Sequence, residues 1–214
     1  MATLLSDTFT DTNGTALASH TMDVGPGWTA LSGTWQINAS NQATETAQAG
    51  VEYHCTSDAG QADVTAQVDV TTPTQGSGNC SCGLYCRGSD QNNGWDVIIE
   101  RDAGSYFLGI YERVSGTSTL RASTTLSFTV GTTHTIRAVL SGNSITATVD
   151  GANTTSYSPA SSNQAVTKFG LENYCDGSNY GPALFDNFLV TGSSTPPVGK
   201  VVEANQAVTN AATF

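Results

Sequence analysis

Hydrophobic and polar side chains alternate in steps of two along most of the chain. In the clearest case, Val64, Ala66, Val68 and Val70 alternate with polar residues. This period predicts a strand of an antiparallel sheet with one buried face and one solvated face. Apolar residues at helical spacing are rarely sustained before Thr, Gly or Asn interrupts them. The pattern therefore predicts an all-β protein.

The segment 136–149 predicts a β-hairpin. Apolar residues alternate over 136–140 and again over 145–149, and the Gly-containing loop 141–143 lies between them. Further strands are predicted between clusters of Gly, Asn, Asp and Ser, at residues 34–37, 51–55, 82–87, 95–101, 106–114, 168–174 and 183–191. The segment 106–114 is apolar on both faces, which predicts a central position. Strands in this number and spacing predict an antiparallel two-sheet β-sandwich of the jelly-roll type.

The composition changes after residue 192. The stretch 193–197 reads Ser-Ser-Thr-Pro-Pro, which is a stiff polar linker, and the remaining residues 198–214 are too few to fold alone. We therefore predict a jelly-roll domain over 1–192 and a linker with a C-terminal tail over 193–214. The tail is expected to serve assembly or attachment, for example by adding a strand to a neighbouring copy in a homo-oligomer.

The charge of the chain excludes several function classes. Its 214 residues include 7 basic and 18 acidic side chains, which gives a formal net charge of −11. Such a chain disfavours binding to nucleic acid or to anionic lipid. No apolar run is long enough to span a membrane, and residues 1–7 lack the basic and apolar parts of a secretory signal. We expect neither nucleic-acid binding nor membrane insertion.

The cysteines are Cys55, Cys80, Cys82, Cys86 and Cys175. Two disulfides would leave one cysteine unpaired, and the sequence leaves the pairing open. Cys82 and Cys86 share one face of a predicted strand but lie about 13 Å apart, which is too far for a mutual bridge. The spacing is not that of a zinc ribbon, although His54-Cys55 offers further ligand types. We favour disulfides or buried thiols over a metal cluster.

Several short motifs follow one another between residues 7 and 192: Asp7-Thr8-Phe9, Gly27-Trp28, Gly33-Thr34-Trp35, Gly83-Leu84-Tyr85-Cys86-Arg87, Trp95-Asp96-Val97, Val149-Asp150-Gly151, Phe169-Gly170-Leu171 and Phe185-Asp186-Asn187-Phe188. In this order they resemble the concanavalin A-like, laminin G-like jelly-roll family, which occurs in phage structural and carbohydrate-binding proteins. The resemblance implies glycan binding, adhesion or polysaccharide cleavage. It also implies a candidate structural calcium site at Asp7 and Asp186. The alternative is that each Asp caps its own turn.

Three carboxylates on one predicted strand invite comparison with an enzymatic branch of the family. Asp96, Glu100 and Asp102 share a strand face by parity. The branch that resembles laminarinases carries a Glu-x-Asp-x-(x)-Glu pattern, because retaining cleavage needs two carboxylates about 5 Å apart. The pattern is incomplete here, so we expect no catalytic residue. Glu100 and Asp102 are expected at a strand end in solvent, near Arg101.

Aromatic and polar residues suited to sugar binding gather on two predicted strands and one loop. Sugars need apolar platforms together with amides, carboxylates or Arg. The candidates are Tyr85, Arg87, Asn92, Trp95, Glu172 and Tyr174. Parity places Tyr85 with Arg87, and Glu172 with Tyr174, on outward faces. The alternative is that the aromatic rings only cover a sheet.

These observations predict a non-catalytic adhesion or decoration module, with no cofactor beyond the candidate calcium. A polar β composition, the absence of an export signal and the C-terminal tail favour the surface of a phage virion, as a capsid decoration or tail-fibre component. Expected partners are other virion subunits, in a homo-oligomer, and cell-surface glycans. The first alternative is a secreted, extracellular lectin or carbohydrate-binding module. The second is a laminarinase-like glycoside hydrolase.

Overall fold

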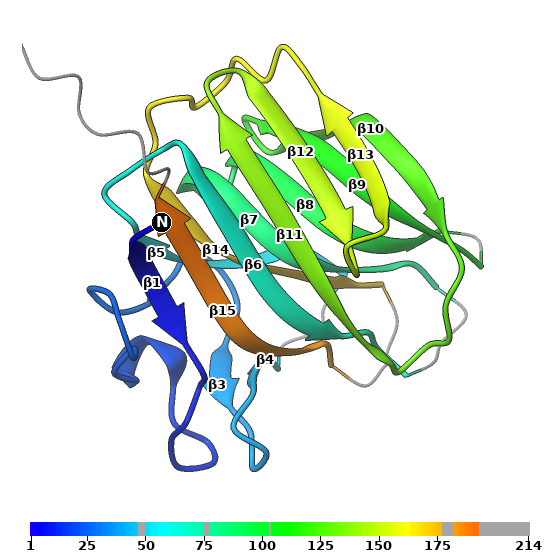
Figure 1. Ribbon diagram of the computed structural model, residues 1–214. Helices are drawn as coiled ribbons and strands as arrows, with labels where there is room; N and C mark the ends of the chain where they lie inside the picture. The colour runs from blue at the N-terminus through cyan, green and yellow to red at the C-terminus, as the bar shows by residue number, and fades with distance from the viewer. Residues whose placement is uncertain (47–49, 75–77, 103, 177–181, 193–214) are drawn as a thin grey trace, which may run out of the picture.

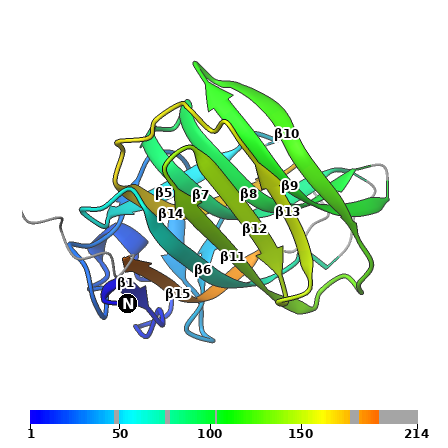
Figure 2. The same cartoon turned by 45° about the horizontal axis from the view of Figure 1, so that its top comes forward.

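Two antiparallel β-sheets pack face to face in the computed structural model, which describes residues 1–46, 50–74, 78–102, 104–176 and 182–192 (Figure 1). Seen from a second direction, the strands of one sheet again lie over those of the other (Figure 2). The predicted all-β, two-sheet sandwich is confirmed. The proposed tail at 193–214 lies outside the described residues.

The first sheet has eight strands. Seven follow the order β13 (Asn153–Tyr157), β12 (Ser144–Val149), β11 (Thr133–Ser141), β6 (Val64–Thr71), β15 (Leu184–Gly192), β4 (Ala43–Glu45) and β3 (Trp35–Ile37). The eighth, β1 (Thr3–Asp7), pairs with β15. The predicted hairpin is β11–β12, and the alternation predicted around Val64 to Val70 appears as alternately buried and half-buried positions along β6.

The second sheet has seven strands. Their order is β10 (Thr117–Leu126), β9 (Ser105–Val114), β8 (Asn93–Asp102), β7 (Cys80–Asp90), β14 (Lys168–Cys175), β5 (Tyr53–Asp58) and β2 (Thr29–Ala30). The segment predicted to be central, β9, lies second from the edge of this sheet, between β10 and β8. Strand β10 was missed because its exposed Thr and Ser side chains give no apolar alternation.

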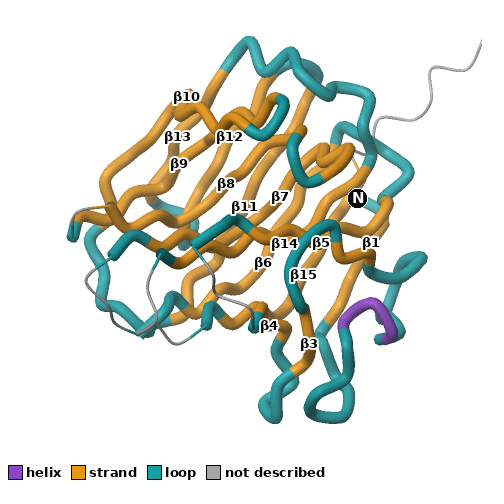
Figure 3. Tube along the Cα trace, turned by 180° about the vertical axis from the view of Figure 1, so that it is seen from behind, coloured by secondary structure: helices purple, strands orange, loops and turns teal. Residues whose placement is uncertain are grey.

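Strands dominate the chain seen from behind, and one short 3-10 helix, η1 (Leu17–Ser19), lies near the N-terminal strands (Figure 3). The core fills the space between the sheets. Trp28 and Trp35 belong to this core and are 4% and 3% exposed. The ring of Trp28 packs against Phe188 with centroids 4.9 Å apart, and Trp35 packs against Phe185 at 5.8 Å.

Strand β7 is the central element of the second sheet and is buried along most of its length. Cys82, Leu84 and Cys86 point into the core, as parity predicts. The prediction that Arg87 shares the outward face of Tyr85 is wrong. The ladder is irregular between Cys86 and Asp90, and Arg87 has a φ of 49°, so alternation fails there.

Arg87 instead joins the ends of the two sheets. Its guanidinium donates to the carbonyl oxygen of Gly142 at 2.9 Å and to Asp63 Oδ1 at 2.9 Å. Both partners belong to turns of the eight-stranded sheet, and Arg87 itself is fully buried. This residue therefore has a structural role between the layers.

Cys80 and Cys175 are directly opposite each other on β7 and β14, with their Sγ atoms 2.7 Å apart. The Asp176 N–H donates to the carbonyl oxygen of Asn79, so the neighbouring Cys80–Cys175 pair occupies a non-hydrogen-bonded position of the ladder. At such positions the Cα atoms lie about 4.5 Å apart, within the range of a disulfide. Cys55, Cys82 and Cys86 lie apart from this pair, in the main core.

We predict that oxidised glutathione converts Cys80 and Cys175 into a disulfide, with two thiol protons and two electrons passing to the glutathione. Thiol titration after unfolding in denaturant should then fall from five groups to three. Peptide mapping should find Cys80 joined to Cys175, and a Cys80→Ser variant should keep its remaining thiols free. A bridge between Cys82 and Cys86 would contradict both the pairing and the strand geometry.

Candidate functional site

The outer face of the seven-stranded sheet carries a group of polar side chains. On β8, Trp95, Val97 and Ile99 face the core, so Asp96, Ile98 and Glu100 face outward. Ser81 of β7 pairs with Glu100 on one side and with Tyr174 of β14 on the other. Three adjacent strands therefore bring carboxylates and hydroxyls to one area of this face.

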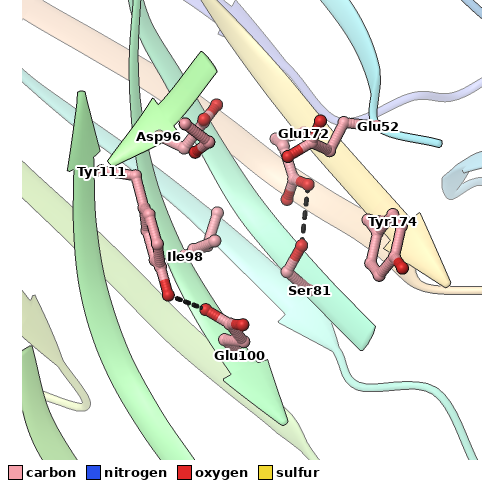
Figure 4. A pocket seen from close by; sticks show the side chains of 9 residues that line it. Glu52, Ser81, Asp96, Ile98, Glu100, Tyr111, Glu172 and Tyr174 are labelled. Atoms are coloured by element: carbon pink, nitrogen blue, oxygen red, sulfur yellow. Dashed lines mark hydrogen bonds between the residues drawn. The ribbon is translucent and has the colours of Figure 1, made fainter. Parts of the chain in front are cut away.

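A pocket of about 130 Å³ is formed there (Figure 4). It is lined by Glu52, Ser81, Asp96, Ile98, Glu100, Tyr111, Ser118, Glu172 and Tyr174. This volume is below the roughly 300–1,000 Å³ of sites that enclose a whole drug-sized ligand. The pocket therefore suits one chemical group or part of one sugar ring.

Arg113 of β9 is the cation beside this pocket. Its Nη2 lies 2.5 Å from Glu52 Oε1 and 3.3 Å from Asp96 Oδ2. Burial disfavours the guanidinium charge, but Asp96 and Glu52 outweigh that effect and raise the pKa of Arg113. The other oxygen of Asp96, Oδ1, lies 3.2 Å from His54 Nε2. Both carboxylate oxygens of Asp96 thus have a partner.

Glu172 has one hydrogen-bonded carboxylate oxygen and one carboxylate oxygen without a partner. Ser81 Oγ donates to its Oε1 at 2.8 Å, whereas Oε2 has no hydrogen-bond partner although the residue is 1% exposed. Burial raises the pKa of Glu172 well above its usual range, and the charge of Asp96 raises it further. The buried carboxyl therefore favours its protonated form until a positive charge comes near.

Glu100 is held by Tyr111, whose hydroxyl donates to Glu100 Oε2 across the pocket (Figure 4). Burial raises the pKa of Glu100 above its usual range. Gly109 gives the Tyr111 ring its room, because a Cβ at position 109 would lie 2.6 Å from Tyr111 Cε2. The ring can therefore lie along β9, with its hydroxyl directed at Glu100.

Two of the six predicted sugar-binding residues, Glu172 and Tyr174, lie in the pocket. Tyr85 is on the outer face, as predicted, but is fully buried. Its ring lies 4.1 Å from that of His54, and its hydroxyl donates to the carbonyl oxygen of Asp90 at 2.6 Å. Tyr85 therefore packs against His54 and has no exposed ring face on which a sugar could stack.

The other three candidates lie away from the pocket. Trp95 points into the core, fully buried, and its Nε1 donates to the carbonyl oxygen of Ser162 at 3.1 Å. Asn92 is exposed in the turn between β7 and β8. Arg87 joins the two sheets. Trp95 was counted with the preceding loop as a sugar-binding residue although the predicted strand 95–101 includes it, and the structure places it in the regular part of β8.

Parity correctly placed Asp96 and Glu100 on one face, and both line the pocket. The expectation that Glu100 lies in solvent is wrong, since it is partly buried against Tyr111. Asp102 is exposed at the end of β8, as expected. Tyr111 could have been found by parity on β9. Glu52 could not have been found in this way, because it lies just before β5 and only the tertiary structure brings it to the pocket.

Asp7 and Asp186, the candidate calcium ligands, have hydrogen-bond partners of their own. Asp7 Oδ1 accepts from the Phe9 N–H at 2.8 Å, and Oδ2 accepts from Trp28 Nε1 at 2.6 Å. Asp186 accepts from the N–H of Asn187, as in a self-capped turn. Among the described residues, no group of three or more His, Cys, Asp or Glu side chains is placed to hold a metal ion. The calcium site stays a prediction.

Comparison with known proteins identifies the fold. No protein-family model and no curated protein sequence match the chain. A solved carbohydrate-binding module, CBM66 of Bacillus subtilis, is similar with a TM-score of 0.57 and 18% identity, over 75% of this chain and 92% of that one. The carbohydrate recognition domain of Emp47p is similar with a TM-score of 0.57 and 10% identity, over 88% of this chain and 95% of that one.

A glycoside hydrolase of family GH43 from Bacillus licheniformis is also similar, with a TM-score of 0.62 and 13% identity. The match covers 87% of this chain but 39% of the enzyme. At such low identities these likenesses establish the β-sandwich fold. Within the part of the chain that the structure describes, no helix is long and apolar enough to cross a membrane.

We predict that Arg113→Met lowers the free energy of unfolding by about 3–5 kcal/mol, because it leaves the buried Asp96 without its cation. The matched control is Arg121→Met. Arg121 pairs with Glu112 but is 37% exposed, so its loss should cost less than about 1 kcal/mol. Urea denaturation of both variants measures the difference. Equal losses would show that the Arg113 pair does not organise this face.

Proposed function

We propose that the chain is a carbohydrate-binding domain and that the pocket on the outer face of the seven-stranded sheet holds one end or one ring of a sugar. The observation that carries the proposal is the combination of polar groups from adjacent strands with two tyrosines in one pocket. Sugar sites need this combination, since hydroxyls require donors and acceptors and the C–H face of the ring requires an aromatic surface.

The arrangement of the side chains supports this role. Tyr111 and Tyr174 lie at opposite sides of the pocket, with the carboxylates between them (Figure 4). The lining comes largely from hydrogen-bonded strands, which hold binding groups more rigidly than loops do. Similar sandwiches include a carbohydrate-binding module and a carbohydrate recognition domain, which is consistent with the proposal.

We predict that Tyr174→Ala weakens binding of the best ligand from a glycan array at least tenfold, because it removes the aromatic surface at one wall. The control is Tyr157→Ala on the other sheet, which should bind like the native protein. Isothermal titration gives the affinities, and a thermal melt verifies that both variants fold. The proposal fails if no glycan on the array binds, or if Tyr174→Ala binds normally.

A glycoside hydrolase is the second candidate, because Glu172 of β14 joins the two β8 carboxylates, Asp96 and Glu100, in the pocket. A buried carboxyl such as Glu172, with a raised pKa, is the usual form of a general acid. Binding remains the favoured function, because the similar carbohydrate-binding module and carbohydrate recognition domain are matched over 92% and 95% of their length, whereas the GH43 enzyme is matched over 39% of its length.

We therefore predict that the protein releases no reducing sugar from laminarin or agar, or from any glycan that it binds. A reducing-end assay over several hours measures this, with each substrate alone as the blank. Release that disappears in both Glu100→Gln and Glu172→Gln would replace binding with hydrolysis as the function of the pocket.

We also propose, from the sequence, that the domain acts on the surface of a phage virion as part of a homo-oligomer. The polar β composition and the predicted tail at 193–214 support this assignment. A secreted, extracellular lectin or carbohydrate-binding module is the alternative. None of the three similar structures named above is described as a virion protein.

A further inference from the structure

The pocket has an excess of negative charge. Four carboxylates line it, those of Glu52, Asp96, Glu100 and Glu172. Arg113 forms ion pairs with Glu52 and Asp96. Within the described part of the chain, Glu100 and Glu172 have no ion-pair partner and are held only by the hydroxyls of Tyr111 and Ser81.

One of these lining carboxylates has a buried oxygen without a hydrogen-bond partner. Glu172 is 1% exposed, and its Oε2 makes no hydrogen bond while Ser81 occupies Oε1. A buried polar atom without a partner costs about 1–3 kcal/mol, and more when the group is charged. A ligand that brings both a donor and a positive charge to this oxygen would remove that cost.

We infer that the pocket selects amino sugars with a free, protonated amine, whose ammonium group donates to Glu172 Oε2 and to Glu100. This inference rests on the proposed sugar-binding function and adds the ligand class. An ammonium group has three donors, so it can serve two carboxylates at once, and its charge matches the unpaired acidic groups. Uronic acids, sialic acids and sulfated sugars would be repelled.

The size and donor set of the pocket fit an ammonium group better than a metal ion. A volume of about 130 Å³ accommodates a substituent on a sugar ring. No three His, Cys, Asp or Glu side chains in the described regions are arranged as metal ligands. Ca²⁺ takes six to eight oxygen ligands and Mg²⁺ takes six, whereas an ammonium group has only three donors to satisfy.

Binding of a cation here depends on pH. Burial, Asp96 and Glu52 raise the pKa of Glu172, whereas Ser81 and Arg113 lower it, and the net effect keeps this pKa well above the ordinary range. At acidic pH, Glu172 carries a proton that an ammonium ligand must displace. Affinity for an amino sugar should therefore increase as pH rises, until the amine itself loses its proton. Affinity for a neutral sugar should lack this dependence on Glu172 ionisation.

The test is a glycan array of matched pairs, each a free-amine sugar with its N-acetylated form, followed by titration of the strongest pair at pH 5 and pH 7. The pairs include glucosamine, galactosamine and mannosamine, alone and as β-1,4-linked glucosamine oligomers. We expect the free-amine member to bind at least tenfold more tightly at pH 7, with a smaller preference at pH 5. Glu172→Gln should abolish the preference.

The matched control is Glu112→Gln, which makes the same chemical change next to Tyr111. Glu112 pairs in register with the core-facing Trp95, so it lies on the opposite face of β9. The Glu112→Gln variant should therefore leave the preference for the free amine unchanged.

Trilysine tests whether positive charge alone suffices for binding, and trilysine binding as tight as that of the amino sugar would overturn the inference. Binding of neutral or acidic sugars with no gain from a free amine would overturn it too, while sugar binding itself would stand. If no glycan on the array binds, the proposed sugar-binding function itself is refuted.

Discussion

The contact of Arg113 with Glu52 and Asp96 is the interaction on which the polar face of the molecule depends. Arg113 and Asp96 lie where water has little access, whereas Glu52 is 37% exposed. An ion removed from water costs several kcal/mol unless it is paired. Through one nitrogen, Arg113 links a residue that precedes β5 to strand β8. Arg113 and His54 thereby engage both oxygens of Asp96. Glu172 forms no ion pair among the described residues and its Oε2 has no hydrogen-bond partner, so this is the position of the pocket where a further donor can bind.

The central strands of the seven-stranded sheet are buried on both faces, but by different kinds of side chain. The inner face packs apolar side chains, including the three core cysteines, against the eight-stranded sheet. The outer face buries charged and hydrogen-bonded side chains among themselves. Strand β7 therefore has little freedom to move. A binding group carried by such a strand loses little conformational entropy when a ligand arrives, which favours affinity.

The same features that stabilise the sandwich also limit where a site can form. At one end of β7, an irregular ladder turns Arg87 toward Asp63 and Gly142, and this guanidinium joins the two sheets. At the other end, Cys80 and Cys175 are opposite each other on neighbouring strands. Ser81 and Tyr174 lie one residue inward from that pair and line the pocket. The functional area is thus the stretch between a structural arginine and a structural cysteine pair.

Alternation along β6, β7, β8 and β11 was sufficient to predict an all-β sandwich and to place Asp96 with Glu100 on one face. Parity is a local property, because successive side chains of a strand point to opposite sides wherever the strand lies. It failed at Arg87, where a positive φ breaks the alternation, and it misjudged the burial of Glu100. The meeting of Glu52, Glu172 and Arg113 could not be predicted, because it depends on the order of strands that are far apart in the chain. The sequence by itself determined the fold class and the face that residues occupy where a strand is regular. The tertiary structure decided which of those residues share a pocket, since strand pairing sets the neighbours and burial sets their charge.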